Sequence, residues 1–189
     1  MPHPLLIILT GPSGSGKSTI LDMLKARKPF PFQRFVTCTT RAKRPGEKNG
    51  KDYWFVTRED FERDLKKNRF FESAEVYGNY YGSSKEEFER LKDTKKPILM
   101  VLDVQGAETM KRVIPNTFIV FLDASKKALT DRLKKRGTEA AEMKRRTDQL
   151  TEEEMHRGIA DTYIKNKEGE IEETYQVVVE ASLDRFRRT

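Results

Sequence analysis

The stretch "LLIILTGPSGSGKSTI", Leu5 to Ile20, joins an apolar run to a glycine-rich turn and then to a segment with helical character. Its middle part, Gly11 to Ser18, fits the pattern G-x-x-x-x-G-K-[ST] at every fixed position. Glycines let backbone N–H groups curl around phosphates, and the N-terminus of the following helix adds partial positive charge. The stretch therefore predicts a phosphate-binding loop between a buried strand and a helix.

The loop residues suit the phosphates of a nucleoside triphosphate with bound Mg²⁺. Lys17 is expected to reach the β- and γ-phosphates, and the Ser18 hydroxyl to ligate the metal. Asp103, at the end of "ILMVLD", is a second predicted metal ligand. The strand and helix on either side disfavour a chance match of a glycine-rich turn. The predicted triphosphate-binding residues are Gly11, Pro12, Ser13, Gly14, Ser15, Gly16, Lys17, Ser18 and Thr19.

Apolar runs of strand type recur along the chain, with helical signals between them. They lie at Leu5–Leu9, Phe35–Val36, Ile98–Leu102, Phe118–Leu122 and Gln176–Val179. Central strands of a parallel sheet have this composition, and alternation with helices favours right-handed crossovers. The predicted fold class is α/β, a parallel sheet flanked by helices.

Two regions depart from this alternation. Between about residues 37 and 81, short aromatic pieces such as "DYWFV" and "NYYGSS" predict a small, mostly β insertion with one helix. Thr57 and Asp60 are placed to cap that helix, with Phe61 and Leu65 on one of its faces. Residues 126–151 are strongly basic, and a capping-box pattern then begins at Thr151.

Composition narrows the class of protein. The 189 residues are 36% hydrophobic and 35% charged, which fits one soluble globular domain. Cys38 is the only cysteine, so an intramolecular disulfide is impossible. The longest apolar run is too short to cross a membrane, and no secretory signal pattern is present, so the cytoplasm is expected. The net charge of +7 favours anionic partners, either nucleic acid or smaller phosphates.

Arginines and tyrosines gather in "TTRAKRPGEKNGKDY", Thr39 to Tyr53. Arg41 and Arg44 precede a Pro-Gly turn, and the planar guanidinium donates two hydrogen bonds to a phosphate at once. Tyr53 and Tyr81 add hydroxyl donors, so the four side chains suit a terminal phosphate dianion. Surface salt bridges and packed aromatic rings are the alternative, and these residues alone do not decide between the two.

Five motifs make the chain similar to the guanylate kinase family, which transfers a phosphoryl group from ATP to GMP. They are "GPSGSGKST", "TTRAKRPGEKNGKDYWFV", "FFESAEVYGNYYGSS", "LDVQGA" and "RLKKRGTE", within about residues 5–139. The resemblance implies that the GMP phosphate is surrounded by Thr37, Arg41, Arg44, Tyr53 and Tyr81. It implies that Glu72, Ser83 and Asp103 read the base.

The chemistry of guanine agrees with these assignments. Guanine presents N1–H and an amino group as donors, which suit the carboxylates of Glu72 and Asp103, and its O6 can accept from Ser83. Adenine has no N1–H and would leave a buried carboxylate unpaired, which supports discrimination. The alternative for Glu72 is an ordinary surface carboxylate.

The basic segment corresponds, by the same resemblance, to a lid that closes over ATP. Arg132 and Arg136 are four residues apart and share a helix face, and Arg146, with Arg145 as its alternative, follows. The expected catalytic residues are Lys17, Arg41, Arg44, Arg132, Arg136 and Arg146. The single domain is expected to divide into a core (1–36, 89–125 and 152–189), a GMP-binding insertion (37–88) and the lid (126–151).

Two departures from the family pattern concern the C-terminal part. Glu180 stands where similar proteins have an asparagine near the adenine, and the last helix, ending in "RFRRT", is expected to be short. The expected ligands are ATP with Mg²⁺ and GMP, without nucleic acid or membrane, in a monomer or homodimer. A kinase for another or modified nucleoside monophosphate, a guanylate-kinase-like module that binds proteins, and a basic nucleic-acid-binding protein are the alternatives. Lys17, Ser18 and the lid arginines disfavour a non-catalytic module.

Overall fold

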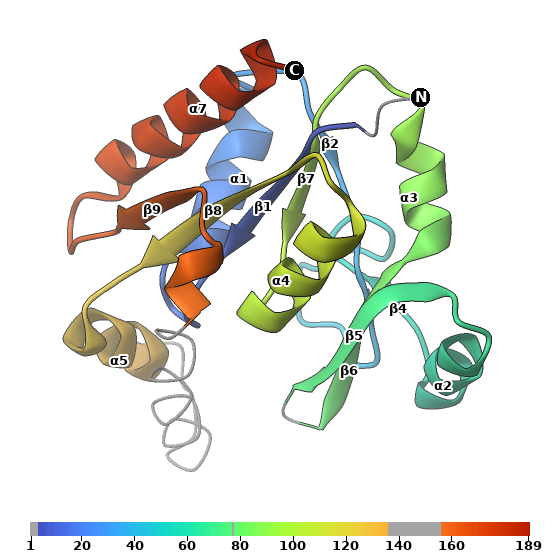
Figure 1. The fold of residues 1–189 in the computed structure, drawn as a ribbon. Coiled ribbons are helices and arrows are strands. Elements are labelled where there is room, and N and C mark those ends of the chain that lie inside the picture. Colours follow the sequence, from blue (N-terminus) through green and yellow to red (C-terminus); the bar gives the residue numbers. More distant parts are fainter. Residues whose placement is uncertain (1–3, 77, 136–155) are drawn as a thin grey trace.

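The main sheet is parallel and has the strand order β2-β7-β1-β8-β9 in a computed structural model that describes residues 4–76, 78–135 and 156–189 (Figure 1). Its strands are β1 (Leu6–Thr10), β2 (Gln33–Arg34), β7 (Ile98–Val101), β8 (Thr117–Asp123) and β9 (Thr162–Lys165). β1 lies at the centre, and all five of its residues are buried. The predicted parallel sheet is therefore confirmed.

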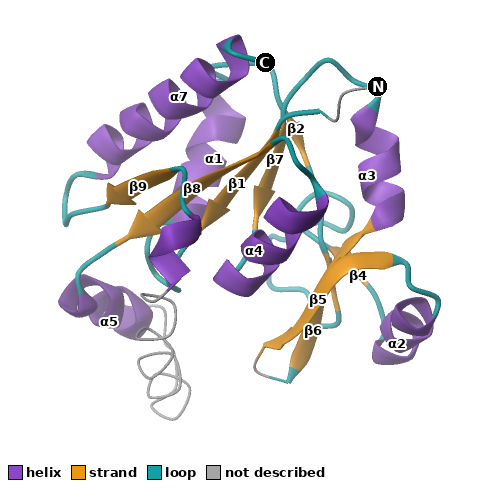
Figure 2. Ribbon diagram, in the orientation of Figure 1, coloured by secondary structure: helices purple, strands orange, loops and turns teal. Residues whose placement is uncertain are grey.

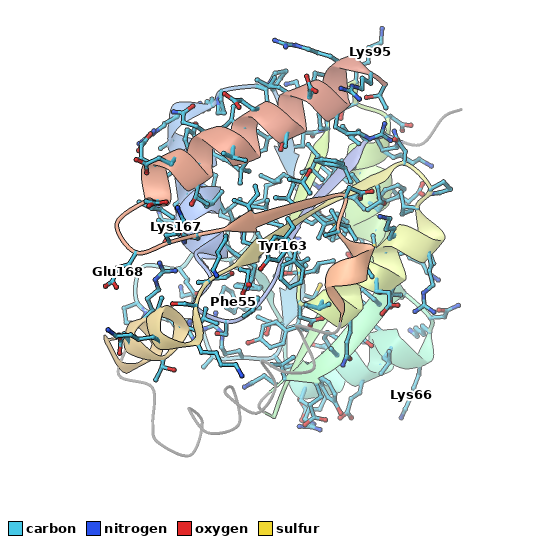
Figure 3. The ribbon with its side chains drawn as sticks, turned by 60° about the vertical axis from the view of Figure 1, so that its left-hand side comes forward. Phe55, Lys66, Lys95, Tyr163, Lys167 and Glu168 are labelled. Atoms are coloured by element: carbon cyan, nitrogen blue, oxygen red, sulfur yellow. The ribbon has the colours of Figure 1, made fainter. Side chains whose placement is uncertain are left out.

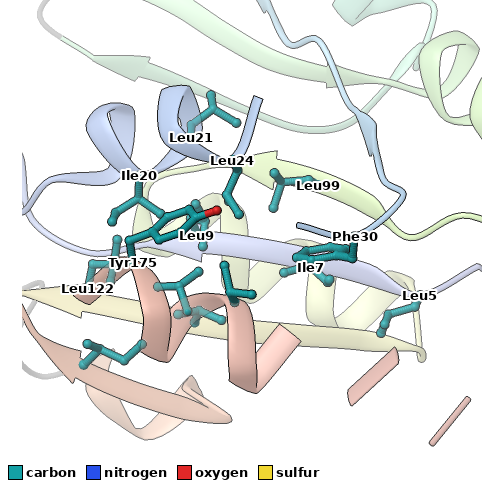
Figure 4. Packing of buried hydrophobic residues seen from close by; sticks show 14 residues of the cluster. Leu5, Ile7, Leu9, Ile20, Leu21, Leu24, Phe30, Leu99, Leu122 and Tyr175 are labelled. Carbon is teal, nitrogen blue, oxygen red and sulfur yellow. The ribbon is translucent and has the colours of Figure 1, made fainter. Parts of the chain in front are cut away.

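Helices cover both faces of this sheet. They are α1 (Lys17–Arg27), α3 (Lys85–Lys92), α4 (Val104–Val113) and α7 (Ile171–Arg187). Ile7 and Leu9 pack with α1 and α7 (Figure 4), whereas Leu6 and Ile8 pack with α3 and α4. Since neighbouring residues of a strand point to opposite faces, an uninterrupted apolar run such as "LIIL" is what a strand covered on both sides requires.

A smaller sheet forms the predicted insertion, with the strand order β4-β3-β6-β5 (Figure 2). Its strands are β3 (Cys38–Thr39), β4 (Trp54–Phe55), β5 (Phe70–Val76) and β6 (Asn79–Ser84), and its helix is α2 (Arg58–Lys66). The Thr57 hydroxyl accepts a hydrogen bond from the Asp60 backbone N–H at 3.1 Å, which confirms the predicted cap. Phe61 is fully buried and stacks on Phe70 and Tyr80, while Leu65 is 43% exposed.

The apolar run Gln176–Val179 is not a strand, and this prediction was wrong. It lies inside α7, which is 17 residues long rather than short. Tyr175, Val178 and Val179 are buried at helical spacing, whereas Val177 is 44% exposed. The fifth strand of the sheet is instead β9, which precedes this helix.

Two further predictions from the sequence, a strand and a helix cap, are not confirmed as stated. The strand expected at Phe35–Val36 lies directly before these residues instead, as β2 at Gln33–Arg34, although Phe35 N–H still donates to the Leu99 carbonyl at 2.9 Å. The helix cap expected at Thr151 lies outside the described residues. Across the described ranges, no helix combines the length and the apolar character that crossing a bilayer requires.

Candidate active site

The glycine-rich loop leaves β1 at the carboxyl edge of the main sheet and enters α1. Gly11 has a φ of 124°, and a Cβ there would lie 2.0 Å from the Leu122 carbonyl oxygen of β8. Gly16 has a φ of 110° and is the N-cap of α1, with no side-chain cap hydrogen bond. Backbone conformation and close packing therefore both require glycine in this loop.

The polar side chains of the loop lie at its opening. The Lys17 ammonium donates to the carbonyl oxygens of Gly11 at 2.6 Å and Pro12 at 2.8 Å, so it lies over the loop. Ser18 is exposed in the first turn of α1, which contains no acidic residue. A helix N-terminus of this kind attracts anions through its unpaired N–H groups and its dipole.

Asn166 ties three elements to this loop, and sequence reasoning missed it. Its side-chain amide donates to the Ser15 carbonyl at 2.8 Å and accepts from the Thr174 hydroxyl at 3.2 Å, which links the end of β9 to α7. Glu180, by contrast, is exposed on α7. The available signal was an asparagine directly after "TYIK", at the carboxyl end of a strand.

One of the predicted lid arginines contacts the loop. Arg132, on α5 (Lys126–Lys135), donates from Nη1 to the Gly14 carbonyl at 3.1 Å. Arg136, Arg145 and Arg146 lie outside the described residues. α5 follows β8 directly, so the same edge of the sheet presents the loop and this guanidinium.

Three of the residues predicted to hold a monophosphate cluster in the insertion. The Arg41 guanidinium lies 5.4 Å from the ring centre of Tyr53 and 5.7 Å from that of Phe55. Tyr53 and Tyr81 pack edge to face with their ring centres 6.0 Å apart. Burial raises the pKa of the Tyr53 phenol, so its O–H remains a hydrogen-bond donor at neutral pH.

Glu47 organises the two arginines of this region, and sequence reasoning did not select it. Its Oε1 accepts from Arg41 Nη2 at 2.7 Å, and its Oε2 accepts from the backbone N–H of Arg44 at 2.8 Å. Burial alone would raise the pKa of the Glu47 carboxyl, but the hydrogen bonds from Arg41 and Arg44 lower it. The Arg44 side chain is exposed. Thr37 is buried just before β3, and its carbonyl accepts from the Trp54 N–H.

The three predicted base-reading residues meet where α4 approaches β5. Ser83 is fully buried and donates its hydroxyl to Glu72 Oε1. Asp103 is the N-cap of α4 and accepts from the Gly106 N–H at 2.8 Å. A Cβ on Gly106 would lie 3.1 Å from Glu72 Oε2 and 3.4 Å from Asp103 Oδ1, so the missing side chain lets both carboxylates face the same helix end.

The carboxyl group of Glu72 has a pKa above its usual range. Burial, together with the nearby Asp103 charge, raises its pKa to about 7, although the hydrogen bond from Ser83 opposes this shift. Two acceptor groups held this close favour a ligand that brings N–H donors to them.

The described residues contain no group of three or more His, Cys, Asp or Glu side chains that could hold a metal ion by themselves. Mg²⁺ takes few protein ligands when phosphates are available, and its preferred ligands are oxygens. The exposed Ser18 hydroxyl fits this chemistry. Asp103 uses Oδ1 to cap α4 and lies with Glu72, which fits base reading better than a metal site.

Comparisons with known proteins give the family to which the chain is similar. The guanylate kinase family model matches residues 3–184. The guanylate kinase of onion yellows phytoplasma is 45% identical over 137 residues, which cover 71% of this chain but only 65% of that relative. The guanylate kinase of Symbiobacterium thermophilum is 38% identical over 164 residues, covering 86% of this chain and 77% of the relative.

A solved structure extends the similarity over nearly the whole chain. Guanylate kinase from Anaplasma phagocytophilum superposes with a TM-score of 0.74 at 29% identity and covers 97% of this chain and 87% of its own. The protein TT1252 from Thermus thermophilus, at 17% identity and a TM-score of 0.57, shares the fold. The fold, the glycine-rich loop and these matches lead to one conclusion: the chain belongs to the guanylate kinase family.

Proposed function

We propose that the protein transfers the γ-phosphoryl group of ATP to GMP, and to dGMP, giving ADP and the nucleoside diphosphate in the cytoplasm. The observation that carries this proposal is the pairing of Glu72 with Asp103 beside the Ser83 hydroxyl. Two carboxylate acceptors and one hydroxyl match the two donors and the O6 acceptor of guanine. The membership of the guanylate kinase family supports the same reaction.

The loop from Gly11 to Thr19 holds the ATP phosphates in this proposal. Its backbone N–H groups and the N-terminus of α1 stabilise the phosphate charge, and Lys17 leaves its carbonyl partners to reach the β- and γ-phosphates. Mg²⁺, when bound, neutralises charge between these phosphates, and Ser18 is the residue that would hold it. Arg132, and Arg136 and Arg146 beyond it, add positive charge during transfer.

The insertion holds GMP. Arg41, Arg44, Tyr53 and Tyr81 surround its phosphate, with Thr37 beside them. A phosphate monoester has its second pKa near 6, so the attacking oxygen is already anionic and no general base is required. The protein then accelerates the reaction by aligning two anions and stabilising the charge that they share.

The direct test is the release of ADP, measured with ATP and each nucleoside monophosphate in turn. We expect fast turnover with GMP and dGMP and much slower turnover with AMP, CMP and UMP. A different preferred monophosphate would identify a kinase of another specificity. Tight GMP binding without any ADP release would instead identify a non-catalytic binding module.

Glu47 gives a prediction specific to the arginine arrangement. Glu47→Gln keeps the shape of the side chain but loses the charge that holds Arg41. We expect the KM for GMP to rise about tenfold, the scale of one charged hydrogen bond, while the KM for ATP stays unchanged. Glu62→Gln is the control, because it removes a carboxylate from an exposed Arg58 pair on α2. An unchanged KM for GMP in Glu47→Gln would contradict the role of Glu47.

A further inference from the structure

A pocket of about 540 Å³ lies at the β2 edge of the main sheet, and none of its lining residues is among those proposed to bind nucleotides. It is formed by the C-terminal half of α1, the end of β2, α3 and the turn at residues 46–52. Its lining residues are Lys25, Arg34, Val36, Gly46, Lys48, Gly50, Lys51, Asp52 and Arg90. We call it the edge pocket. Its volume is within the usual range for small-ligand sites.

The charges around the edge pocket do not balance. The lining contains five cationic side chains and one carboxylate, Asp52. Two more carboxylates pair with these cations from outside, Asp22 with Lys25 at 3.4 Å and the buried Glu87 with Arg90 at 2.8 Å. Five cations against three carboxylates leave an excess of two positive charges.

The two excess positive charges lie on the turn at residues 46–52. Lys48 and Lys51 are exposed, and within the described parts of the chain neither ammonium group forms an ion pair. Arg34, by contrast, donates to the Asp52 carbonyl at 2.6 Å and to the Lys51 carbonyl. Two lysines therefore remain available to an anion, and a fixed guanidinium lies beside them.

The turn that carries these lysines is held in place before any ligand arrives. Asp52 Oδ2 accepts from the Lys48 backbone N–H at 2.8 Å, and its Oδ1 lies 3.4 Å from Arg34 Nη1 and 3.7 Å from Lys25 Nζ. These contacts attach the turn to β2 and α1. A preformed site binds an anion at a lower entropic cost than lysines on a free loop.

The lining residues also indicate which class of anion fits the edge pocket. It contains no aromatic side chain, and Val36 is its only branched apolar residue. A nucleobase would find no ring to stack on, whereas phosphoryl oxygens suit lysine ammonium groups, which act as mobile point charges. The lining therefore favours a small, strongly charged ligand over a nucleotide.

We propose that the edge pocket is a second anion site, which takes a small phosphorylated anion without a nucleobase. Lys25, Lys48 and Lys51 contact its phosphoryl oxygens. The turn continues from Asp52 directly into Tyr53, which lies against Arg41, so a bound anion steadies the segment that leads to the residues proposed to hold the GMP phosphate.

The test uses pyrophosphate as the probe, followed by backbone amide NMR of the intact protein. An adenosine–guanosine pentaphosphate bisubstrate analogue first saturates the proposed nucleotide sites, so that pyrophosphate cannot report on the phosphate-binding loop. We expect saturable shifts of the Val36, Lys48, Gly50 and Lys51 amides. Inorganic phosphate and sulfate should produce the same shifts with weaker affinity.

Matched variants separate a built site from general attraction by a basic surface. Lys48→Gln with Lys51→Gln should raise the Kd for pyrophosphate about tenfold, the scale of two lost exposed ion pairs. Lys66→Gln with Lys95→Gln removes the same charge from side chains that project from the surface elsewhere, and should leave the Kd unchanged (Figure 3). Thermal unfolding checks that both double variants are folded. The absence of saturable shifts in the edge pocket, or equal weakening by both pairs, would overturn the proposal.

Discussion

Lys17→Ala is expected to lower kcat at least about a hundredfold, the scale of losing one donor that stabilises a transition state. In the free protein the ammonium group donates to the Gly11 and Pro12 carbonyls, so it already lies at the mouth of the proposed ATP phosphate site. During transfer it would neutralise charge on the moving phosphoryl group. The measurement is steady-state ADP release at saturating ATP and GMP.

A control variant separates loss of catalysis from loss of the folded state. Lys66→Ala removes an exposed lysine from α2 and should retain full activity. The Kd for GMP should stay near its original value in Lys17→Ala, because the proposed GMP contacts come from the insertion and from Asp103. Near-normal turnover in folded Lys17→Ala would refute the proposed phosphoryl transfer at this loop.

Glu72→Gln should lower kcat/KM for GMP about a hundredfold and reduce the preference for guanine. The amide can still accept from Ser83, but it presents an NH₂ group where guanine requires an acceptor. IMP is the most informative comparison, since it keeps N1–H and O6 but lacks the amino group. The measurement is kcat/KM for GMP, dGMP, IMP and AMP.

Arg44→Lys is the matched contrast, because it changes phosphate binding rather than base reading. Lysine keeps the charge but loses the planar guanidinium, so all four monophosphates should weaken by a similar factor. The assignment of these residues would be reversed if Glu72→Gln lowered all four equally while Arg44→Lys changed their ranking.

The raised pKa of Glu72, about 7, adds a pH dependence to the same experiment. Below pH 7 the free carboxyl is increasingly protonated and loses acceptor capacity, so the Kd for GMP should rise as the pH falls from 8 to 6. The GMP phosphate also titrates near pH 6 and contributes in every variant. Glu72→Gln should retain only that phosphate contribution, and an identical pH profile in both proteins would contradict the role of Glu72.

Local signals made parts of the fold predictable. The glycine-rich loop and the Thr57 cap each depend on a few neighbouring residues, and the structure confirms the loop between β1 and α1 and the cap. The run at Gln176–Val179 was wrongly predicted as a strand, because three consecutive valines suit both a strand and a buried helix face. β9 gave only a weak signal, since Ile164 is buried while Tyr163 on one side is 43% exposed and Lys165 on the other is exposed.

The site was predictable where side-chain chemistry identified its residues. Arg41 with Tyr53, and Glu72 with Asp103, lie together as their proposed roles require. Glu47 was not predictable, because it lies in the polar run "PGEKNG" and its role depends on a turn that folds it back on Arg41. Asn166 depends on a contact between residues 151 positions apart in the chain.

Trp54 has a practical consequence for spectroscopy. It is the only tryptophan of the chain, it is 37% exposed, and it lies in β4 directly after Tyr53. A Cβ on Gly50 would meet its ring at 2.8 Å, so the indole also packs on the turn of the edge pocket. Its fluorescence therefore comes from the insertion alone, which makes the unmodified protein its own optical reporter of events there, without an attached dye.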